Sequence, residues 1–222
     1  MRVLVACEFS GRVRDAFLRL GHQAVSCDLL PSNNLGPHIQ DSILNHLTPD
    51  WDLLIAFPPC THLASSGARW FKSKPHLQQE ALNFVSLLWS APIPHIALEN
   101  PIGILSTHFR RPDQIINPWQ FGHPESKSTC LWLKNLPTLR PTRICEPDWL
   151  CRCGCIFPFP LGKYGCPSCH SGPARPTWKN QTITNQNKVP QSRNRWKLRS
   201  LTYPGIASAM ATQWSTYVLN HP

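Results

Sequence analysis

Long apolar runs are missing from this chain of 222 residues, and no stretch approaches the roughly 20 apolar residues that a membrane-spanning helix needs. The chain also lacks a charged start followed by an apolar stretch and a cleavage site, which would indicate secretion. We therefore expect a cytoplasmic protein. In that compartment the ten cysteines are expected to be metal ligands, core thiols or catalysts rather than disulfide partners.

Acidic residues are scarce. Asp and Glu total 12 against 22 Lys and Arg, which gives a formal net charge of +10 and an isoelectric point near 9.4. This surplus favours a polyanionic partner. Basic residues gather late in the chain with two tryptophans among them: Arg175, Trp178, Lys179, Lys188, Arg193, Arg195, Trp196, Lys197 and Arg199. The pattern predicts contact with nucleic acid, and the alternative is a solvated loop whose charges maintain solubility.

The start of the chain alternates predicted strands and helices. Residues 2–6 form an apolar strand, residues 8–11 a tight turn, and residues 12–20 a helix. A second strand at residues 24–27 ends in Asp28. Strand, glycine turn, helix, strand and acid is the layout of a nucleoside-cofactor site, in which the acid hydrogen-bonds the ribose hydroxyls.

Two prolines end the apolar run at residues 51–56, in the motif Phe57-Pro58-Pro59-Cys60. The fixed φ of proline forces a short extended loop, which holds Cys60 at the carboxyl edge of the predicted sheet. Ligands bind at that edge in open α/β folds. Cys60 is therefore a candidate nucleophile, with a buried space-filling thiol as the alternative.

A later apolar run at residues 95–98 ends in Glu99-Asn100-Pro101. If this run and residues 51–56 are neighbouring parallel strands, Glu99 lies at the same sheet edge as Cys60, and a carboxylic acid can work beside a thiolate. Helical spacing of apolar residues predicts one helix over residues 77–88 and a closing helix over residues 206–218. Three tryptophans are expected in the core: Trp119, Trp132 and Trp214.

Six potential zinc ligands lie between residues 151 and 170. Cys166-Pro-Ser-Cys169 is a well-formed half of a zinc knuckle, because its backbone N–H groups point at the two sulfurs. Gly154 allows the first half to turn back in the same way, so we expect Cys151 and Cys153 to be the other pair of ligands. Cys155 and His170 remain alternative ligands. A reduced cysteine-rich loop without metal is the other interpretation.

These motifs carry a resemblance to the DNA cytosine-carbon-5 methyltransferases, in particular to small members carried by phages and prophages. The matching residues are the Phe9-Ser10-Gly11 turn, Asp28, Asp41, Pro58-Pro59-Cys60 and Glu99-Asn100. The resemblance covers roughly residues 1–137 and 193–220. It implies an α/β class I S-adenosylmethionine-dependent methyltransferase (Rossmann-like) fold with a small zinc-ribbon insert.

The resemblance also implies roles for individual residues. Cys60 would attack carbon 6 of a flipped cytosine, Glu99 would hydrogen-bond the ring, and Asn100 would hold Glu99 in place. S-adenosylmethionine would be bound by a set of residues from the turn and the strand ends: Glu8, Phe9, Ser10, Gly11, Asp28, Asp41 and Pro58. Asp28 would contact the ribose, and Asp41 would approach the adenine.

The sequence departs from the family in three respects. The glycine-rich turn is reduced to one glycine followed by Arg12-Val13-Arg14, and the family's Gln-x-Arg-x-Arg strand has only residues 125–132, with Lys127, as its nearest candidate. The chain has no room for a large target-recognition domain. We expect a catalytic core at 1–140, a zinc-ribbon insert with a basic flank for DNA recognition at 141–192, and a segment completing the core at 193–222.

The expected protein is a monomeric DNA methyltransferase. Two alternatives stay open at this point. One is a related carbon-5 pyrimidine-modifying enzyme that acts on another nucleic-acid substrate. The other is a non-catalytic zinc-ribbon DNA-binding protein on a degenerate methyltransferase fold. The intact Cys60 and Glu99 favour an enzyme, whereas the reduced glycine turn favours the non-catalytic protein.

Overall fold

A computed structural model describes residues 1–65, 75–158, 165–170, 174–182, 188–189 and 192–221. The chain divides into two compact units. The first unit comprises residues 1–116, 128–140 and 206–222, and the second comprises residues 117–127 and 141–205. Residues 117–127 and 193–205 therefore group with the cysteine-rich segment, and not with the core and its closing segment as expected from the sequence.

The first unit is built on a seven-stranded sheet with the order β3-β2-β1-β4-β5-β7-β6. Its strands are β1 (Arg2–Ala6), β2 (Gln23–Asp28), β3 (His38–Gln40), β4 (Leu53–Ala56), β5 (His95–Pro101), β6 (Gln114–Ile116) and β7 (Thr129–Lys134). Only β7 runs antiparallel to its neighbours, so the other six strands share one direction. The predicted α/β class with a Rossmann-like sheet is confirmed.

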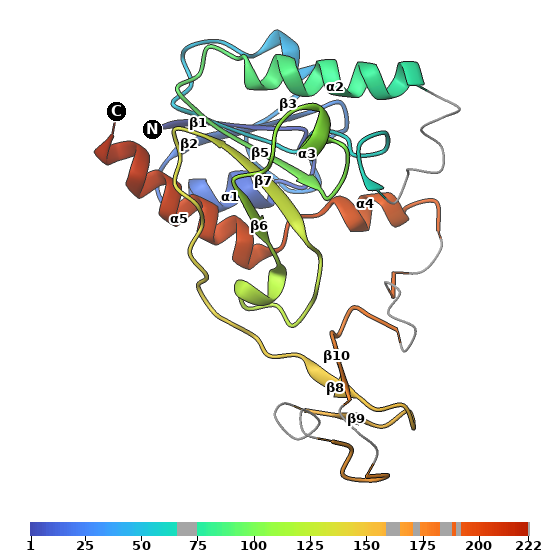
Figure 1. The fold of residues 1–222 in the computed structure, drawn as a ribbon. Helices are drawn as coiled ribbons and strands as arrows, with labels where there is room; N and C mark the ends of the chain where they lie inside the picture. Colours follow the sequence, from blue (N-terminus) through green and yellow to red (C-terminus); the bar gives the residue numbers. More distant parts are fainter. Residues whose placement is uncertain (66–74, 159–164, 171–173, 183–187, 190–191, 222) are drawn as a thin grey trace. The chain divides into compact units, whose positions relative to one another are not determined.

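Helices cover both faces of this sheet. Figure 1 shows α2 (Pro75–Trp89) on one side, with α1 (Arg12–Leu18) and α5 (Pro204–Asn220) on the other. Because both faces are covered, β4 is buried at every residue and β1 at all but its first, which explains why these strands are continuous apolar runs. Val85 and Leu88 of α2 pack into the main apolar cluster. Two short helical segments, η1 (Ile43–Asn45) and α3 (Leu105–His108), lie between strands.

The expected helices and core tryptophans are largely as predicted. The helix expected over 77–88 is part of α2, and the closing helix is part of α5. Trp132 and Trp214 are fully buried, and the Trp214 Nε1–H donates to the carbonyl of Pro137 at 3.0 Å. Trp119 instead belongs to the second unit, where it is half-buried and its ring stacks on that of Trp178.

The second unit contains a three-stranded antiparallel sheet with the order β10-β8-β9. Its elements are η3 (Pro118–Gln120), β8 (Asp148–Leu150), β9 (Ile156–Phe157), β10 (Arg175–Thr177) and α4 (Arg195–Ser200). Its apolar cluster is small and consists largely of cysteine, with Cys151, Cys166 and Ala174 buried at its centre. Among the described residues of both units, no helix is long and apolar enough to cross a membrane.

Candidate functional site

The strand register brings the predicted site residues of the first unit to one edge of its sheet. Ala6 pairs with Cys27 on one side and with Ala56 on the other, and Ala56 pairs in turn with Leu98. These positions lie at or near the carboxyl ends of β1, β2 and β4, while β5 continues beyond them by pairing with β7. The site residues at this edge are Glu8 after β1, Asp28 at the end of β2, the Phe57–Cys60 loop after β4, and Glu99, which pairs with Leu131 near the end of β5.

The loop that carries Cys60 is fixed by hydrogen bonds at both ends. The Phe57 N–H donates to the carbonyl of Ala6 at 3.0 Å. After the prolines, the N–H groups of Leu63 and Ala64 both donate to the carbonyl of Cys60, at 3.0 and 2.9 Å, and so form a tight turn. Cys60 is half-buried. The loop and the turn thus place Cys60 on a fixed backbone just after the carboxyl end of β4.

Asn100 joins this loop to β5. Its Nδ2 donates to the carbonyl of Pro58 at 2.8 Å, and the side chain is 1% exposed. Adjacent residues of a strand point to opposite faces of the sheet, so Glu99 and Asn100 project in opposite directions. Asn100 therefore holds the loop from one face while Glu99 lies on the other. The Asn100 Oδ1 is buried with no hydrogen-bond partner among the described residues.

A second connection, not found from the sequence, runs through Gly103. The Ser65 N–H donates to Ile102 O at 3.0 Å, and the Ile104 N–H donates to Leu63 O at 2.9 Å, so that Gly103 forms a β-bridge with Ala64. A Cβ on Gly103 would lie 1.9 Å from the carbonyl oxygen of Leu63. Only a glycine allows this approach. The segment after Cys60 and the segment after Glu99 are therefore one bridged structure.

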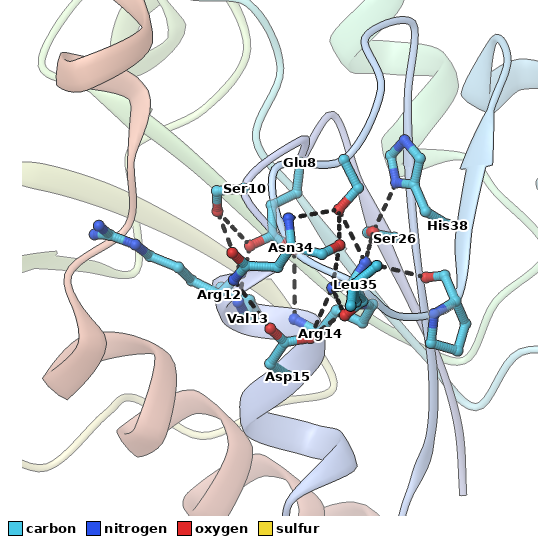
Figure 2. A network of polar contacts seen from close by, with 12 residues as sticks. Glu8, Ser10, Arg12, Val13, Arg14, Asp15, Ser26, Asn34, Leu35 and His38 are labelled. Atoms are coloured by element: carbon cyan, nitrogen blue, oxygen red, sulfur yellow. Dashed lines mark hydrogen bonds and ion pairs between the residues drawn. The ribbon is translucent and has the colours of Figure 1, made fainter.

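Glu8, a predicted cofactor residue, has a structural partner in helix α1. Its carboxylate accepts hydrogen bonds from the Val13 N–H at 2.8 Å, the Ser10 hydroxyl at 2.9 Å and the Arg14 N–H at 3.4 Å (Figure 2). A carboxylate at this position satisfies the free N–H groups of the first helical turn. Glu8 is 5% exposed, and burial raises the pKa of its carboxyl group, although the hydrogen bonds from Val13 and Ser10 oppose the rise.

Arg14 is the largest departure from what the sequence suggests. Its side chain is 0% exposed, and its guanidinium binds the segment that follows Asp28 (Figure 2). It donates to the hydroxyls of Ser26 and Ser32 and pairs with Asp15 at 2.8 Å. It also donates to three backbone carbonyls, those of Asn34, Leu35 and Pro37. Burying a guanidinium requires such full compensation, and here the partners come mainly from residues 32–37.

Arg14 also explains the single glycine of the turn. A Cβ on Gly11 would lie 2.4 Å from a terminal nitrogen of Arg14, and Gly11 has a φ of +71°. Glycine is therefore required here by its backbone conformation and by the guanidinium. In the usual nucleotide-binding turn, glycines are needed because the ligand approaches the backbone. The presence of glycine at position 11 is thus explained by Arg14, as it would also be by a bound cofactor.

The other predicted cofactor residues fall into two groups. Phe9, Ser10 and Pro58 are buried. Asp28 is half-buried at the end of β2; burial raises the pKa of its carboxyl group, and it accepts the Leu30 N–H at 2.9 Å. Asp41 accepts hydrogen bonds from the Ser42 N–H at 2.7 Å and from the His46 ring N–H at 2.9 Å. These two partners flank the short helix η1. Of the two acids, Asp28 lies at the carboxyl end of β2, where an acid contacts the ribose in nucleotide-binding folds.

In the second unit, the four cysteines expected as zinc ligands lie together. The Sγ atoms of Cys151, Cys153, Cys166 and Cys169 are all within 4.8 Å of one another. The Cys151–Cys169 and Cys153–Cys166 pairs are separated by 3.5 and 3.7 Å. Zn–S bonds of about 2.3 Å in a tetrahedron require sulfurs about 3.8 Å apart. The spacing and the all-thiolate donor set therefore fit zinc, and Cys155 and His170 are outside this cluster.

Lys127, considered as a substitute for the missing arginine, lies outside β7, which begins at Thr129. Its Nζ donates to the carbonyl of Arg199 at 2.8 Å, at the C-terminal end of α4. In the same unit, the Tyr203 hydroxyl donates to the Glu125 carboxylate. The segment expected to resemble a substrate-binding strand therefore connects two parts of the second unit.

No family profile matches the chain, and no curated protein matches it. Among solved structures, the chain is similar to a mutant of DNMT2 from Spodoptera frugiperda, with 17% sequence identity and a TM-score of 0.42. The alignment covers 64% of this chain and 54% of that protein, so this chain spans about half the length of its neighbour. A likeness this distant assigns neither substrate nor activity, which depend on the side chains described above.

Proposed function

We propose that this protein is an S-adenosylmethionine-dependent methyltransferase that modifies carbon 5 of cytosine in DNA. The observation that carries the proposal is the hydrogen bond from Asn100 to Pro58. It joins a proline-bounded thiol loop to the end of the strand that carries a carboxylic acid. A nucleophile and an acid on a shared, rigid backbone are what covalent activation of a pyrimidine requires.

The proposed chemistry uses Cys60 as the nucleophile and Glu99 as the acid. The Cys60 thiolate forms a bond to carbon 6 of a cytosine flipped out of the stack, and the ring electrons move toward carbon 5. Glu99 hydrogen-bonds N3 and the exocyclic amine and stabilises the charge that develops there. S-adenosylmethionine, when bound, supplies the methyl group. A water molecule then accepts the carbon-5 proton, and the electron pair left behind re-forms the double bond between carbons 5 and 6 and expels the Cys60 thiolate.

Cofactor recognition is proposed for the carboxyl ends of β1 and β2. Asp28 would accept hydrogen bonds from the ribose hydroxyls. Phe9, Ser10 and Gly11 would line the cofactor site in the turn between β1 and α1. Glu8 and Arg14 support these contacts from inside the fold, since one begins helix α1 and the other holds the segment after Asp28.

A trapping experiment tests the nucleophile. With cofactor present, DNA that contains 5-fluorocytosine should form a covalent complex with the protein, because fluorine does not leave as a proton does. Cys60→Ser should fold and bind cofactor but form no complex. An adduct that persists in Cys60→Ser would place the nucleophile elsewhere and remove the basis of the proposed mechanism.

DNA is the proposed partner, through the zinc ribbon and the basic residues that follow it. Phosphate contacts release counterions, so affinity should fall steeply with salt. Replacing Arg193, Arg195, Lys197 and Arg199 with glutamine should reduce the log–log salt slope by about 0.9 for each lost phosphate contact. Equal slopes for mutant and parent would leave these charges with a role in solubility alone.

The second candidate is a non-catalytic zinc-ribbon DNA-binding protein. Two observations favour it: the Glu8 carboxylate is occupied by helix α1, and the space above Gly11 is occupied by Arg14. Calorimetry with S-adenosylmethionine separates the two functions. Saturable binding that is weakened by Asp28→Ala supports the enzyme. DNA binding without any cofactor binding supports the second candidate.

A further inference from the structure

Helix α4, at Arg195–Ser200 in the second unit, buries none of its residues. Its two large apolar side chains are more than half exposed: Trp196 at 52% and Leu198 at 55%. Tryptophan is usually well buried because removing its large surface from water is favourable. An exposed indole on a helix with no buried residue therefore indicates a surface that a binding partner covers.

The charged residues of α4 and of its flanking sequence are all basic. The sequence has no Asp or Glu after Asp148, whereas Arg193, Arg195, Lys197 and Arg199 lie in or beside the helix. The ammonium of Lys197 lies 5.6 Å from the centre of the Trp196 ring. An aromatic surface surrounded by cations is complementary to a polyanion that also has flat rings, which describes nucleic acid.

Polar contacts hold α4 at its C-terminal end. Lys127 donates to the carbonyl of Arg199, and the Ser200 hydroxyl donates to the carbonyl of Lys197 at 2.9 Å. Just beyond, Tyr203 donates to Glu125, and the Gly205 N–H donates to His123 Nε2 at 2.9 Å. The bonds to Lys127, Glu125 and His123 join the end of α4 and the residues just after it to the segment 117–127 of the same unit. Trp196 is thus presented on an anchored helix.

We propose that Trp196 is a stacking platform for an unpaired base of a single-stranded nucleic acid, with the neighbouring cations on the flanking phosphates. The faces of paired bases are covered by their neighbours in a duplex, so an indole stacks far more readily on an unpaired base than between the paired bases of a duplex, where neighbouring bases must first be unstacked. Stacking of a base on an aromatic side chain contributes about 1–3 kcal/mol by alanine substitution. This proposal deepens the proposed nucleic-acid substrate but does not depend on methyl transfer.

Fluorescence anisotropy of the full-length protein, without cofactor, tests the proposal. The probes are an end-labelled single-stranded DNA, an RNA of the same sequence and the corresponding DNA duplex. Trp196→Ala should weaken binding to single strands by about 5- to 150-fold and leave the salt slope unchanged, because no charge is removed. Binding to the duplex should change far less. The affinity ratio of the two single strands tells DNA from RNA.

Two variants of the same helix sharpen the result. Trp196→Phe keeps an aromatic face and should restore most of the affinity. Leu198→Ala removes an equally exposed apolar side chain without a ring and should change affinity less than about twofold. Unchanged zinc content and circular dichroism would show that the variants fold.

Trp196→Ala binding within about twofold of the parent protein would overturn the proposal. An equal loss in Leu198→Ala, or an equal loss on duplex, would also overturn it, because the contact would then not be base stacking. Cys60 adduct formation is a separate measurement. Its absence together with a strong Trp196 effect would reject the methyltransferase and keep the stacking platform, and the reverse result would do the opposite.

Discussion

The amide nitrogen of Asn100 lies 2.8 Å from the carbonyl oxygen of Pro58, and through this contact the strand of Glu99 sets the position of the Cys60 loop. The two motifs are 42 residues apart in sequence. Neither the prolines nor the strand could fix this distance alone, because a loop is free to shift over the edge of a sheet. The bond makes one rigid unit of the two candidate catalytic segments.

Asn100→Asp should break this unit. The variant keeps the side-chain shape but removes the donor and places a carboxyl oxygen against the Pro58 carbonyl in a buried site. We expect the free energy of unfolding to fall by about 1–3 kcal/mol and trapping by Cys60 to slow. Asn135→Asp is the matched control, because Asn135 donates to the Pro94 carbonyl at 2.9 Å in an exposed position. It should cost less than about 0.5 kcal/mol in urea unfolding. Equal costs would argue against a special role for Asn100.

Gly103→Ala should alter the chemistry of Cys60 as well as stability. The added methyl group would meet Leu63 O, so the segment after Cys60 must move. Gly205→Ala is the control, because its Cβ would also lie 1.9 Å from a backbone oxygen, that of Phe121 in the second unit. Both variants should lose about 1–3 kcal/mol through overpacking. Only Gly103→Ala should change the rate at which a small alkylating reagent modifies Cys60, as read by peptide mass spectrometry. A similar rate change in both would reject the bridge as a positioning device.

Glu8 should make stability depend on pH. Its folded-state pKa is raised by burial, so the native state binds this proton more tightly than the unfolded chain does. Stability therefore falls as pH rises from the ordinary carboxyl value, about 4.3, through the raised value. Glu8→Gln lacks this ionisation, and its Oε1 can still accept the Val13 N–H. The unfolding free energy of the parent should decline relative to Glu8→Gln across that range and then level off. A parent protein that becomes more stable relative to Glu8→Gln as pH rises would contradict the burial effect. Glu80→Gln, on the exposed surface of α2, is the surface control.

Zinc should be present in equimolar amount after dialysis, and Cys166→Ser should lose it. Structural zinc contributes on the order of 10 kcal/mol to the folding of small modules, so the second unit should become sensitive to protease while the first stays resistant. Cys155→Ser is the control, because Cys155 packs against the same cluster but is outside the four-sulfur group. Elemental analysis and limited proteolysis give the result. Loss of zinc in Cys155→Ser as well would mean that the ligand set is different.

Much of the first unit is predictable because its signals are local. Apolar runs bounded by prolines, glycine or acids predict β1, β4 and β5, and the Cys-Pro-x-Cys turn with Gly154 predicts the sulfur cluster. Arg14 could not be predicted in the same way. A charged residue in a short helix ordinarily faces water, and its burial depends on the carbonyls of residues 34–37, which only the folded chain brings to it.

The importance of Gly103 could not be predicted from the sequence for a related reason. Its φ is not in the left-handed region, so no turn pattern marks it, and its importance comes from a carbonyl 40 residues earlier in the chain. Likewise, nothing in residues 117–127 indicates that they group with the insert rather than with the strand that follows them. The stacking of Trp119 on Trp178 and the bonds between Asn180 and Ser126 decide it.

The split origin of the second unit limits how freely it can be exchanged. Because it draws on two separate stretches of chain, transfer of residues 141–192 alone would separate Trp178 from Trp119 and the Asn180 side chain from the backbone of Ser126. The transferred segment would carry an uncovered indole and an amide side chain without its two hydrogen-bond partners. Exchange of this module between proteins, in the laboratory or in evolution, therefore has to transfer residues 117–127 together with the insert.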